Sequence, residues 1–416
     1  MTQKGPLCYP YLLIKLVLGF VLSFSTTQLL VVNFASAEII DLSQDWQQGD
    51  LYNQNDLYCN MQAITVPAFL EGYMVIRNGK VLAEYYEEGS TPDDQIESWS
   101  LTKAWSSMLI GKMVDSNLVC TNETLGDIFD QPDDWEGVRQ IEEKKTITLQ
   151  EILSMTSGLK PCFYQSNIKD QETLQDVLDQ VDYEEEFRGK FYYNERSHML
   201  SRIILRRTGL TPFEFMEQEG IFAKLGINST TDFSWDTFGG VEGTAVGLKT
   251  NPRVHAKLGQ LYLQQGLAKE GDEQLISQEW IRRSSTNQLA DGVINYLSPP
   301  GELDGYGYQG WFVNTPDYTG ILEGFTVAFG LFGQIIAYQP SSNTTISIMG
   351  KPPAGSGTSY NFLKNIVENL PHLEVEQSDC DDARLRYVKY LRENGGEVSF
   401  LLWEQLKRFI RTFGAR

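Results

Sequence analysis

Short runs of β-forming residues lie near both ends of the chain's central region. Between Gly72 and Tyr86 two such runs flank Asn78-Gly79, a pair typical of the two-residue turn of a β-hairpin. Beyond residue 300, three more strand-like runs follow at Tyr306–Asn314, Val327–Tyr338 and Thr344–Met349. This order predicts one antiparallel sheet that is built from both chain ends.

The residues between these strands follow the 3.6-residue period of helices. Ile147–Leu159 predicts a helix that is capped by Thr148 and closed by Ser157-Gly158. Further helices are expected at Glu172–Val181, His255–Gln265 and Ser359–Leu370, and the segment Phe191–Gly209 starts with an aromatic run and continues as a helix that contains Met199 and Ile204. The expected fold class is therefore α+β, an antiparallel sheet flanked by helices and carrying a mainly helical inserted subdomain.

The stretch from Ser98 to Ser116 carries the candidate chemistry. It predicts a buried helix, and Ser100 and Lys103 lie three residues apart at its start. Residues at this spacing share a helix face, so the lysine can take the proton of the serine hydroxyl and activate it as a nucleophile. The alternative is an ordinary N-cap serine with a solvated lysine.

The same Ser-x-x-Lys spacing occurs twice more, at Ser157 with Lys160 and at Ser166 with Lys169. The first pair lies in a turn marked by glycine and proline, and the second lies in a polar stretch without a hydrophobic period. Only Ser100 opens a long hydrophobic helix, and we therefore take it as the candidate nucleophile.

Both ends of the chain differ from its centre. Residues 1–37 resemble a signal peptide with an Ala35-Ser36-Ala37 cleavage site, which predicts export to the periplasm or secretion. The alternative is an uncleaved membrane anchor. Residues 38–66 form a lead-in segment and residues 67–370 the catalytic domain. Residues 371–416 are a helical extension whose basic amphipathic end either contacts a membrane surface or packs on the domain.

Composition narrows the classes of partner. The chain has 416 residues and a formal net charge of −21, which disfavours nucleic acid as a partner. Four cysteines, Cys59, Cys120, Cys162 and Cys380, follow the leader, and an even number in an exported chain favours two disulfides. The pairing that we prefer joins Cys59 to Cys380 and Cys120 to Cys162. The alternatives are the two other pairings of these cysteines and free buried thiols. Their spacing fits no zinc site, and no metal or cofactor is expected.

Several segments in order resemble the serine β-lactamase-related family, which includes class C β-lactamases, D-alanyl-D-alanine carboxypeptidases, esterases and 6-aminohexanoate-dimer hydrolases. The resemblance covers roughly residues 65 to 370 and implies a β-lactamase/transpeptidase-like fold. The segments that carry it are Ser100–Lys103, Ile147–Leu159, Tyr192–Asn194, Gly247–Gly266, Gly305–Trp311 and Ala328–Pro340.

The resemblance also implies a role for each matching residue. Ser100 would be acylated, Lys103 would be its proton partner and Tyr192 would pass the proton to the leaving group. Asn194 would orient the substrate. Gly333 ends the third motif, and the amide of Gln334 would complete an oxyanion hole with that of Ser100. The alternatives are that Tyr192 belongs to an aromatic core and that Asn194 only caps a helix.

One position departs from the family's pattern. Leu331 stands where β-lactamases and carboxypeptidases have a lysine or histidine for a substrate carboxylate, which disfavours penicillins and D-Ala-D-Ala ends. The Gly-x-x-Gly-Gln pattern at Gly330–Gln334 resembles the 6-aminohexanoate-dimer hydrolase and esterase branch of the family. The sequence thus predicts an exported serine hydrolase acting on a small ester, an amide or a short peptide. The alternatives are a penicillin-binding hydrolase of cell-wall peptides and a non-catalytic scaffold.

The three histidines, His198, His255 and His372, do not favour a Ser-His-Asp hydrolase. Placement on helix surfaces is the expectation for all three.

Overall fold

The computed structural model describes residues 39–48, 67–159, 178, 181–193, 198–289, 305–313, 322, 324–351 and 356–370. The predicted signal peptide and C-terminal extension lie outside the described residues, as does almost all of the predicted helix Glu172–Val181.

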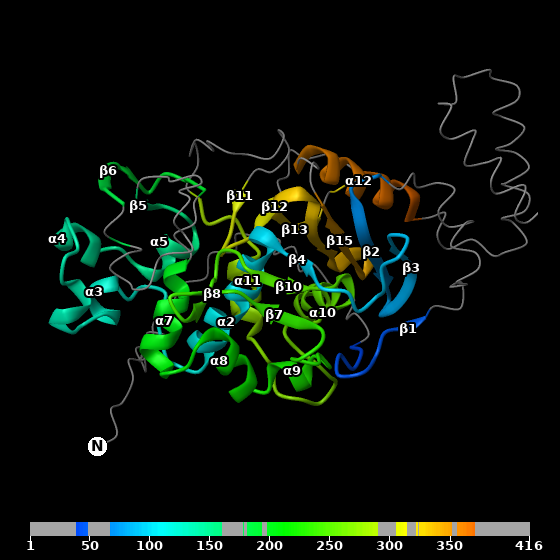
Figure 1. Cartoon of the computed structure of the whole chain (residues 1–416), viewed down its shortest axis with the longest axis horizontal. Coiled ribbons are helices and arrows are strands. Elements are labelled where there is room, and N and C mark those ends of the chain that lie inside the picture. Colours follow the sequence, from blue (N-terminus) through cyan, green and yellow to red (C-terminus); the bar gives the residue numbers. More distant parts are fainter. Residues whose placement is uncertain are drawn as a thin grey trace, which may run out of the picture.

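An eight-stranded sheet forms the centre of the molecule, in the order β1-β3-β2-β15-β14-β13-β12-β11 (Figure 1). Its strands are β1 (Gln47–Gln48), β2 (Leu70–Arg77), β3 (Lys80–Tyr86), β11 (Gly305–Tyr306), β12 (Trp311–Val313), β13 (Phe325–Gly330), β14 (Gln334–Gln339) and β15 (Thr344–Gly350). All neighbouring strands are antiparallel except β1 and β3. The pairing of β2 with β15 confirms that both ends of the domain build one sheet.

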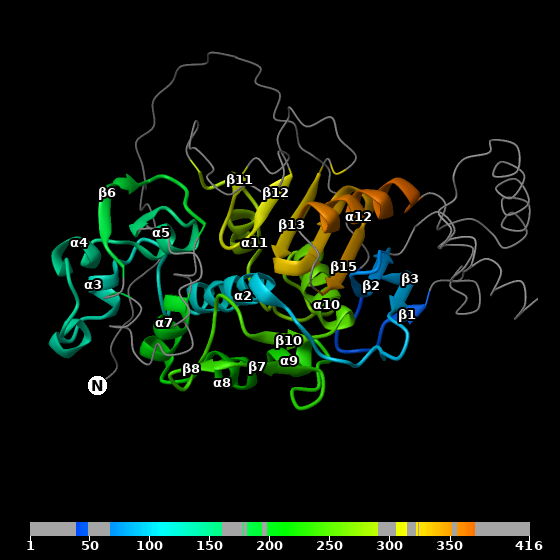
Figure 2. The ribbon, with the colours of Figure 1, turned by 45° about the horizontal axis from the view of Figure 1, so that its top comes forward.

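Helices cover both faces of this sheet (Figure 2). One face packs on α12 (Ser356–Asn369), where the Phe362 ring meets Tyr73 of β2 at 5.6 Å between centroids. The other face packs on α10 (Pro252–Leu263), whose Gly259 lies so close to β14 and β15 that a Cβ there would be 2.7 Å from Thr345. Contact at this distance between helix backbone and sheet requires glycine.

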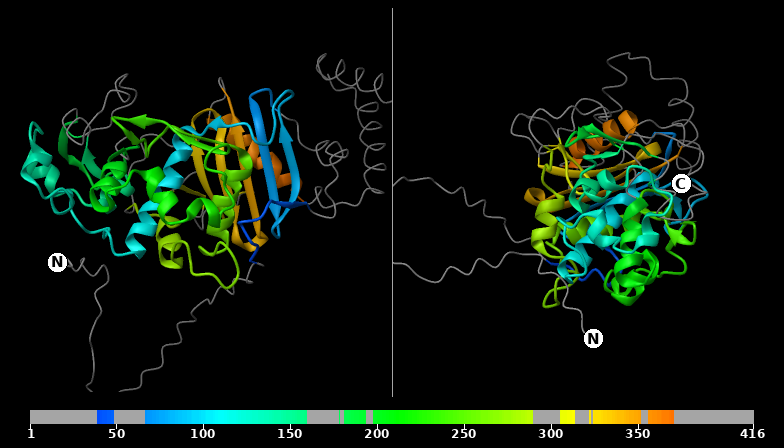
Figure 3. Two further views of the ribbon diagram at one scale, coloured as in Figure 1. Left: turned by 60° about the horizontal axis from the view of Figure 1, so that its bottom comes forward. Right: turned by 90° about the vertical axis from the view of Figure 1, so that its left-hand side faces the viewer.

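The helical region lies between β3 and β11 in the sequence and extends to one side of the sheet (Figure 3). Its helices are α2 (Thr102–Asp115), α3 (Leu125–Ile128), α4 (Ile141–Lys145), α5 (Leu149–Leu153), α7 (Met199–Thr208), α8 (Pro212–Gln218), α9 (Ile221–Lys224) and α11 (Gln278–Ser284). Short strands accompany them: β4 (Ile96–Glu97), β5 (Ser157–Leu159), β6 (Tyr183–Arg188), β7 (Phe233–Trp235), β8 (Thr237–Phe238), β9 (Val241–Glu242) and β10 (Leu248–Thr250). The expected helical insertion is therefore confirmed.

Helix α2 is buried on almost every side, as predicted for the stretch from Ser98 to Ser116. Its first turn follows directly on a 3₁₀ turn, η1 (Trp99–Leu101), which contains Ser100. A helix that is surrounded by side chains on all faces occupies the middle of a domain. The candidate nucleophile is therefore fixed to the most enclosed element of the helical region.

Two predicted elements have different limits in the structure. Val327–Tyr338 is a hairpin, because a left-handed turn at Phe332 and Gly333 folds β14 back on β13. Ile147–Leu159 keeps its Thr148 cap, but the helix ends at Leu153 and Ser157–Leu159 pairs with β6 as strand β5. The helix expected within Phe191–Gly209, after the aromatic run, is confirmed as α7, which begins at Met199.

The segment formed by residues 39–48 links strand β3, near the edge of the sheet, to helix α10. Lys257 of α10 donates hydrogen bonds to the carbonyl oxygens of Leu42, at 2.9 Å, and Gln44, at 3.1 Å. Strand β1 then pairs with β3 along its outer edge. Ile40 packs under the β2–β3 turn. A Cβ on Gly79 of this turn would lie 2.3 Å from the Cγ2 atom of Ile40.

No helix among the described residues is long and hydrophobic enough to span a membrane. Cys120 is disulfide-bonded, and since every other cysteine lies outside the described residues, the predicted pairing stays a prediction.

Replacing Gly79 with alanine should destabilise the domain by about 2–3 kcal/mol, because it combines a left-handed backbone (φ 74°) with a clash against Ile40. Gly89→Ala is the matched control, since Gly89 has φ 92° and no atom within 4 Å of the added Cβ. We expect it to lower the free energy of unfolding by only about 1 kcal/mol in urea. Equal losses in the two variants would show that Ile40 does not stabilise the turn.

Candidate active site

Ser100 lies in η1, a half-buried turn between β4 and the buried helix α2. The turn is held at both ends, because the Ser98 amide donates to the carbonyl of Leu248 at 2.8 Å and the Thr102 hydroxyl donates to that of Trp99 at 2.6 Å. Trp99 adopts a left-handed conformation with φ 47°. A non-glycine residue in this conformation is strained, and such strain is common at functional sites.

Lys103 brings its amine to the Ser100 hydroxyl, as the sequence predicts. The two atoms lie 3.3 Å apart, and the same amine donates to the carbonyl of Ala245 at 3.1 Å. Only 1% of Lys103 is exposed. The lysine is thus enclosed and directed at the serine, which is the arrangement that proton transfer requires.

Most of the two rival Ser-x-x-Lys pairs lies outside the described residues, so the choice between the three pairs stays a prediction. Ser157 lies in β5, and Lys160, Ser166 and Lys169 lie outside the described residues.

The tyrosine pair next to the site divides between two environments. The Tyr193 ring lies under the Lys103 amine, 5.0 Å from ring centroid to Nζ, and it also meets Tyr306. The Tyr192 ring packs edge-on against Phe187 of β6, at 4.7 Å between centroids. The assignment of Tyr192 as the proton carrier therefore stays a prediction, and Tyr193 becomes a second candidate. Asn194 lies outside the described residues.

Gly330, the last residue of β13, comes just before the third motif and touches the nucleophile segment. A Cβ on Gly330 would lie 2.7 Å from the Ser98 carbonyl oxygen and 3.0 Å from the Leu101 nitrogen. Gly333, at the end of the motif, faces the other way, because a Cβ there would lie 2.4 Å from the Ser359 hydroxyl of α12. The residue in close contact with the nucleophile segment is therefore Gly330 and not Gly333.

Gln334 is fully buried at the start of β14, and its side chain bonds to Gly350 of β15, with the amide 2.6 Å from the Gly350 carbonyl oxygen. This bond holds the two strands together behind the turn.

The surroundings of the nucleophile on the β13 side are hydrophobic and uncharged. The rings of Trp99 and Phe332 meet edge-to-face at 5.0 Å, and Leu331 lies next to them in the sequence. Both aromatic residues have positive φ angles. The residues whose side chains β13 directs towards this side of the sheet, Thr326 and Ala328, carry no charge either.

A buried hydrogen-bond chain supports the nucleophile turn from behind. The Trp105 indole donates to Nδ1 of His255 at 3.1 Å, and Nε2 of His255 lies 2.9 Å from the Ser98 hydroxyl. An indole N–H can only donate, so Nδ1 is the acceptor and Nε2 carries the proton. Burial lowers the pKa of His255 to about 3. The imidazole is therefore neutral near pH 7, and it positions Ser98 rather than exchanging protons.

His255 and His198 are both buried, so the expectation of helix-surface histidines is wrong for these two. Sequence reasoning also missed Ser98, Ala245 and Gly330 as neighbours of the nucleophile. The glycine-rich loop Gly239–Gly247 was the one visible signal for Ala245.

No cluster of three or more histidine, cysteine, aspartate or glutamate side chains that could hold a metal ion occurs in the described parts of the chain.

Comparison with known proteins finds a matching family model and a related hydrolase. The family model described as Beta-lactamase matches residues 71–351. The 6-aminohexanoate-dimer hydrolase of Paenarthrobacter ureafaciens is 23% identical over 296 residues, which cover 66% of this chain and 71% of that protein.

Solved structures share the fold at low sequence identity. A penicillin-binding protein homologue from Caulobacter crescentus superposes with a TM-score of 0.57 and 15% identity, covering 79% of this chain and 98% of that one. EstCE1, a hydrolase with promiscuous acyltransferase activity, superposes with a TM-score of 0.54 and 12% identity. The match covers 72% of this chain and 93% of that one.

The buried histidine makes stability depend on pH. Below pH 6.5 the unfolded chain binds a proton at His255 that the folded chain does not bind until about pH 3. His255 therefore lowers the free energy of unfolding as pH falls through this window, by up to about 1.4 kcal/mol per pH unit. His255→Gln should remove this contribution, so that urea titrations of the variant show a shallower loss between pH 6.5 and 4.

Above pH 7 the wild type and His255→Gln should change in parallel, with the variant about 1–3 kcal/mol less stable because its hydrogen bonds are disturbed. Parallel curves over the whole acid range would contradict the neutral assignment of His255.

Proposed function

The chain belongs to the beta-lactamase family of serine hydrolases, and from this premise we propose that it cleaves a small ester or amide through a covalent acyl-enzyme at Ser100. The observation that carries the proposal is the enclosed Lys103 amine, 3.3 Å from the Ser100 hydroxyl at the start of a buried helix. A lysine that is kept from water is suited to accept a proton from the serine.

The proposed cycle has two halves. Ser100 Oγ attacks the carbonyl carbon while its proton passes to Lys103, and the bond to the leaving group breaks as a proton is returned to that group. Water then adds to the ester formed on Ser100, which releases the acid and restores the hydroxyl. The product acid and the freed alcohol or amine together contain the atoms of the substrate and one water.

Two backbone amides would stabilise the negative oxygen that forms in each half. The Ser100 amide is one, since amides in the first turn of a helix lack partners within the helix. The second is the backbone amide of Gln334, a role that the resemblance to the β-lactamase-related family implies. The contact of Gly330 with the nucleophile turn makes the amide of Leu331 an alternative donor.

A neutral substrate fits the surroundings of Ser100 best. Both Leu331 and Ala328 are uncharged, so neither supplies the cation that would hold a substrate carboxylate, and Trp99 and Phe332 offer an aromatic surface instead. The similarity to a 6-aminohexanoate-dimer hydrolase and to EstCE1 supports an amide or an ester. Export remains part of the proposal on the strength of residues 1–37.

Intact mass after incubation with a fluorophosphonate should show one adduct, which peptide mapping places on Ser100. Penicillin should leave the mass unchanged, because Leu331 stands where related β-lactamases have the lysine or histidine that binds the substrate carboxylate. Ser100→Ala should lose the adduct and all ester turnover while its unfolding midpoint stays close to that of the wild type. A stable penicilloyl adduct would favour a cell-wall peptide hydrolase, and a folded protein without any adduct would favour the non-catalytic scaffold.

The two tyrosines can be separated by removing one hydroxyl at a time. Loss of a group that transfers protons lowers kcat by about 10²–10⁴-fold. We expect this loss in Tyr193→Phe, whose ring lies against Lys103, and little change in Tyr192→Phe, whose ring lies against Phe187. Ester hydrolysis followed with p-nitrophenyl acetate measures both. The reverse result would restore the motif-based assignment of Tyr192.

A further inference from the structure

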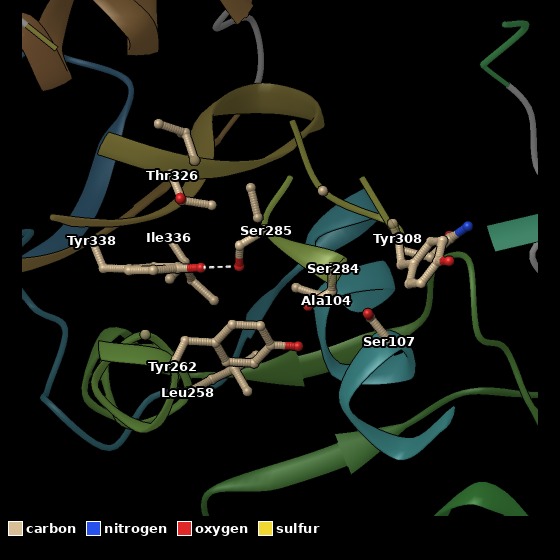
Figure 4. A pocket seen from close by; sticks show the side chains of 15 residues that line it. Ala104, Ser107, Leu258, Tyr262, Ser284, Ser285, Tyr308, Thr326, Ile336 and Tyr338 are labelled. Carbon is tan, nitrogen blue, oxygen red and sulfur yellow. Dashed lines mark hydrogen bonds between the residues drawn. The ribbon is translucent and has the colours of Figure 1, made fainter. Parts of the chain in front are cut away.

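A hollow lies between helix α2, strand β13 and helices α10 and α11 (Figure 4). Its walls carry small side chains, with Ala104 and Ser107 on α2 and Ala328 on β13. Tyr262 and Tyr338 lie at its far end (Figure 4).

Ser100 lies in the 3₁₀ turn that leads into α2, four residues before Ala104 at the wall of the hollow. Ser100, Ala104 and Ser107 follow the i, i+4, i+7 spacing that places residues in one row. On the opposite wall Ala328 precedes Gly330 by two residues, so both lie on one side of the sheet, and Gly330 touches the nucleophile turn. The wall residues Ala104 and Ala328 are therefore four residues from Ser100 and two residues from Gly330.

The two sides of Ser100 have different chemistry. Lys103 and Ser106 face the loop at Thr244 and Ala245, to whose carbonyl oxygens they donate. Protons for a leaving group come from the Lys103 side. The acyl substituent of a substrate is then directed to the Ala104 side, where the hollow begins.

The lining of the hollow is uncharged, since none of its described residues is acidic or basic. At its end the hydroxyls of Ser285 and Tyr338 bond to each other at 2.6 Å (Figure 4). Burial raises the pKa of Tyr262 to about 12 and also raises that of Tyr338, so both phenols remain neutral at working pH. A charged group would lose its hydration here without gaining an ionic partner.

The hollow is also narrow. The space open to the centre of a water-sized sphere is about 40 Å³, roughly three times the minimum for one water molecule. This is room for a chain of a few carbon atoms and not for a ring system or a long lipid tail.

We propose that this hollow is the acyl pocket of the enzyme and selects substrates whose acyl part is a short, unbranched and uncharged chain. The inference rests on the proposed function, since it assigns the part of the substrate that stays on Ser100 after the leaving group departs.

The test compares p-nitrophenyl acetate, butyrate and octanoate. Butyrate should exceed acetate by about tenfold in kcat/KM, because its extra methylenes enter the pocket, and octanoate should fall below butyrate. Ala104→Leu fills the pocket from α2, so it should remove the preference for butyrate by lowering kcat/KM for butyrate much more than for acetate. Ala223→Leu is the matched control, the same change at an exposed helix position on α9, and should keep the wild-type order.

Ala328→Val fills the pocket from the opposite wall and provides a second variant if Ala104→Leu fails to fold. Equal rates for acetate and butyrate in the wild type, or an equal loss of both in the two filled variants, would overturn the acyl pocket while leaving the proposed function in place. Absence of any ester turnover together with absence of fluorophosphonate labelling at Ser100 would overturn the proposed function and the pocket with it.

Discussion

The enclosed amine of Lys103 is the constraint on which the arrangement of the site depends. A lysine that is almost fully buried is tolerated only where polar groups meet its amine, and three separate parts of the chain provide them. The Ser100 hydroxyl comes from the nucleophile turn, the Ala245 carbonyl from the glycine-rich loop and the Tyr193 ring from the segment after β6. The requirement to satisfy one amine therefore brings together the groups that could perform the chemistry.

The nucleophile turn is fixed by contacts that come from beyond it in the sequence. Leu248 accepts a hydrogen bond from its backbone, His255 meets the Ser98 side chain, and Gly330 packs against its peptide groups. These contacts form only when the helical region and the sheet have come together, so the strained backbone at Trp99 can be held in place only in the folded domain. The reactive geometry is a property of the whole domain rather than of the Ser-x-x-Lys motif alone.

How far the sequence predicts this structure depends on the range of each interaction. The Asn78-Gly79 turn, the Thr148 cap and the buried nucleophile helix are local signals, and all three are confirmed. The division of Val327–Tyr338 into two strands was missed because its turn uses Phe332 in a left-handed conformation, which β-forming residues rarely adopt. The buried position of His255 and the contact of Gly330 with Ser98 depend on pairings over more than 150 residues, which no local pattern encodes.

The two-residue strand β1 has a consequence for association between molecules. A long edge strand exposes a row of unpaired backbone groups to which another chain can add, and β3 would be such an edge if the segment containing β1 were absent. In the described sheet both outermost strands, β1 and β11, are only two residues long. Strand β1 consists of two exposed glutamines. The segment that Lys257 fastens to α10 therefore also limits the growth of the sheet, and its release would expose β3 as a template for aggregation.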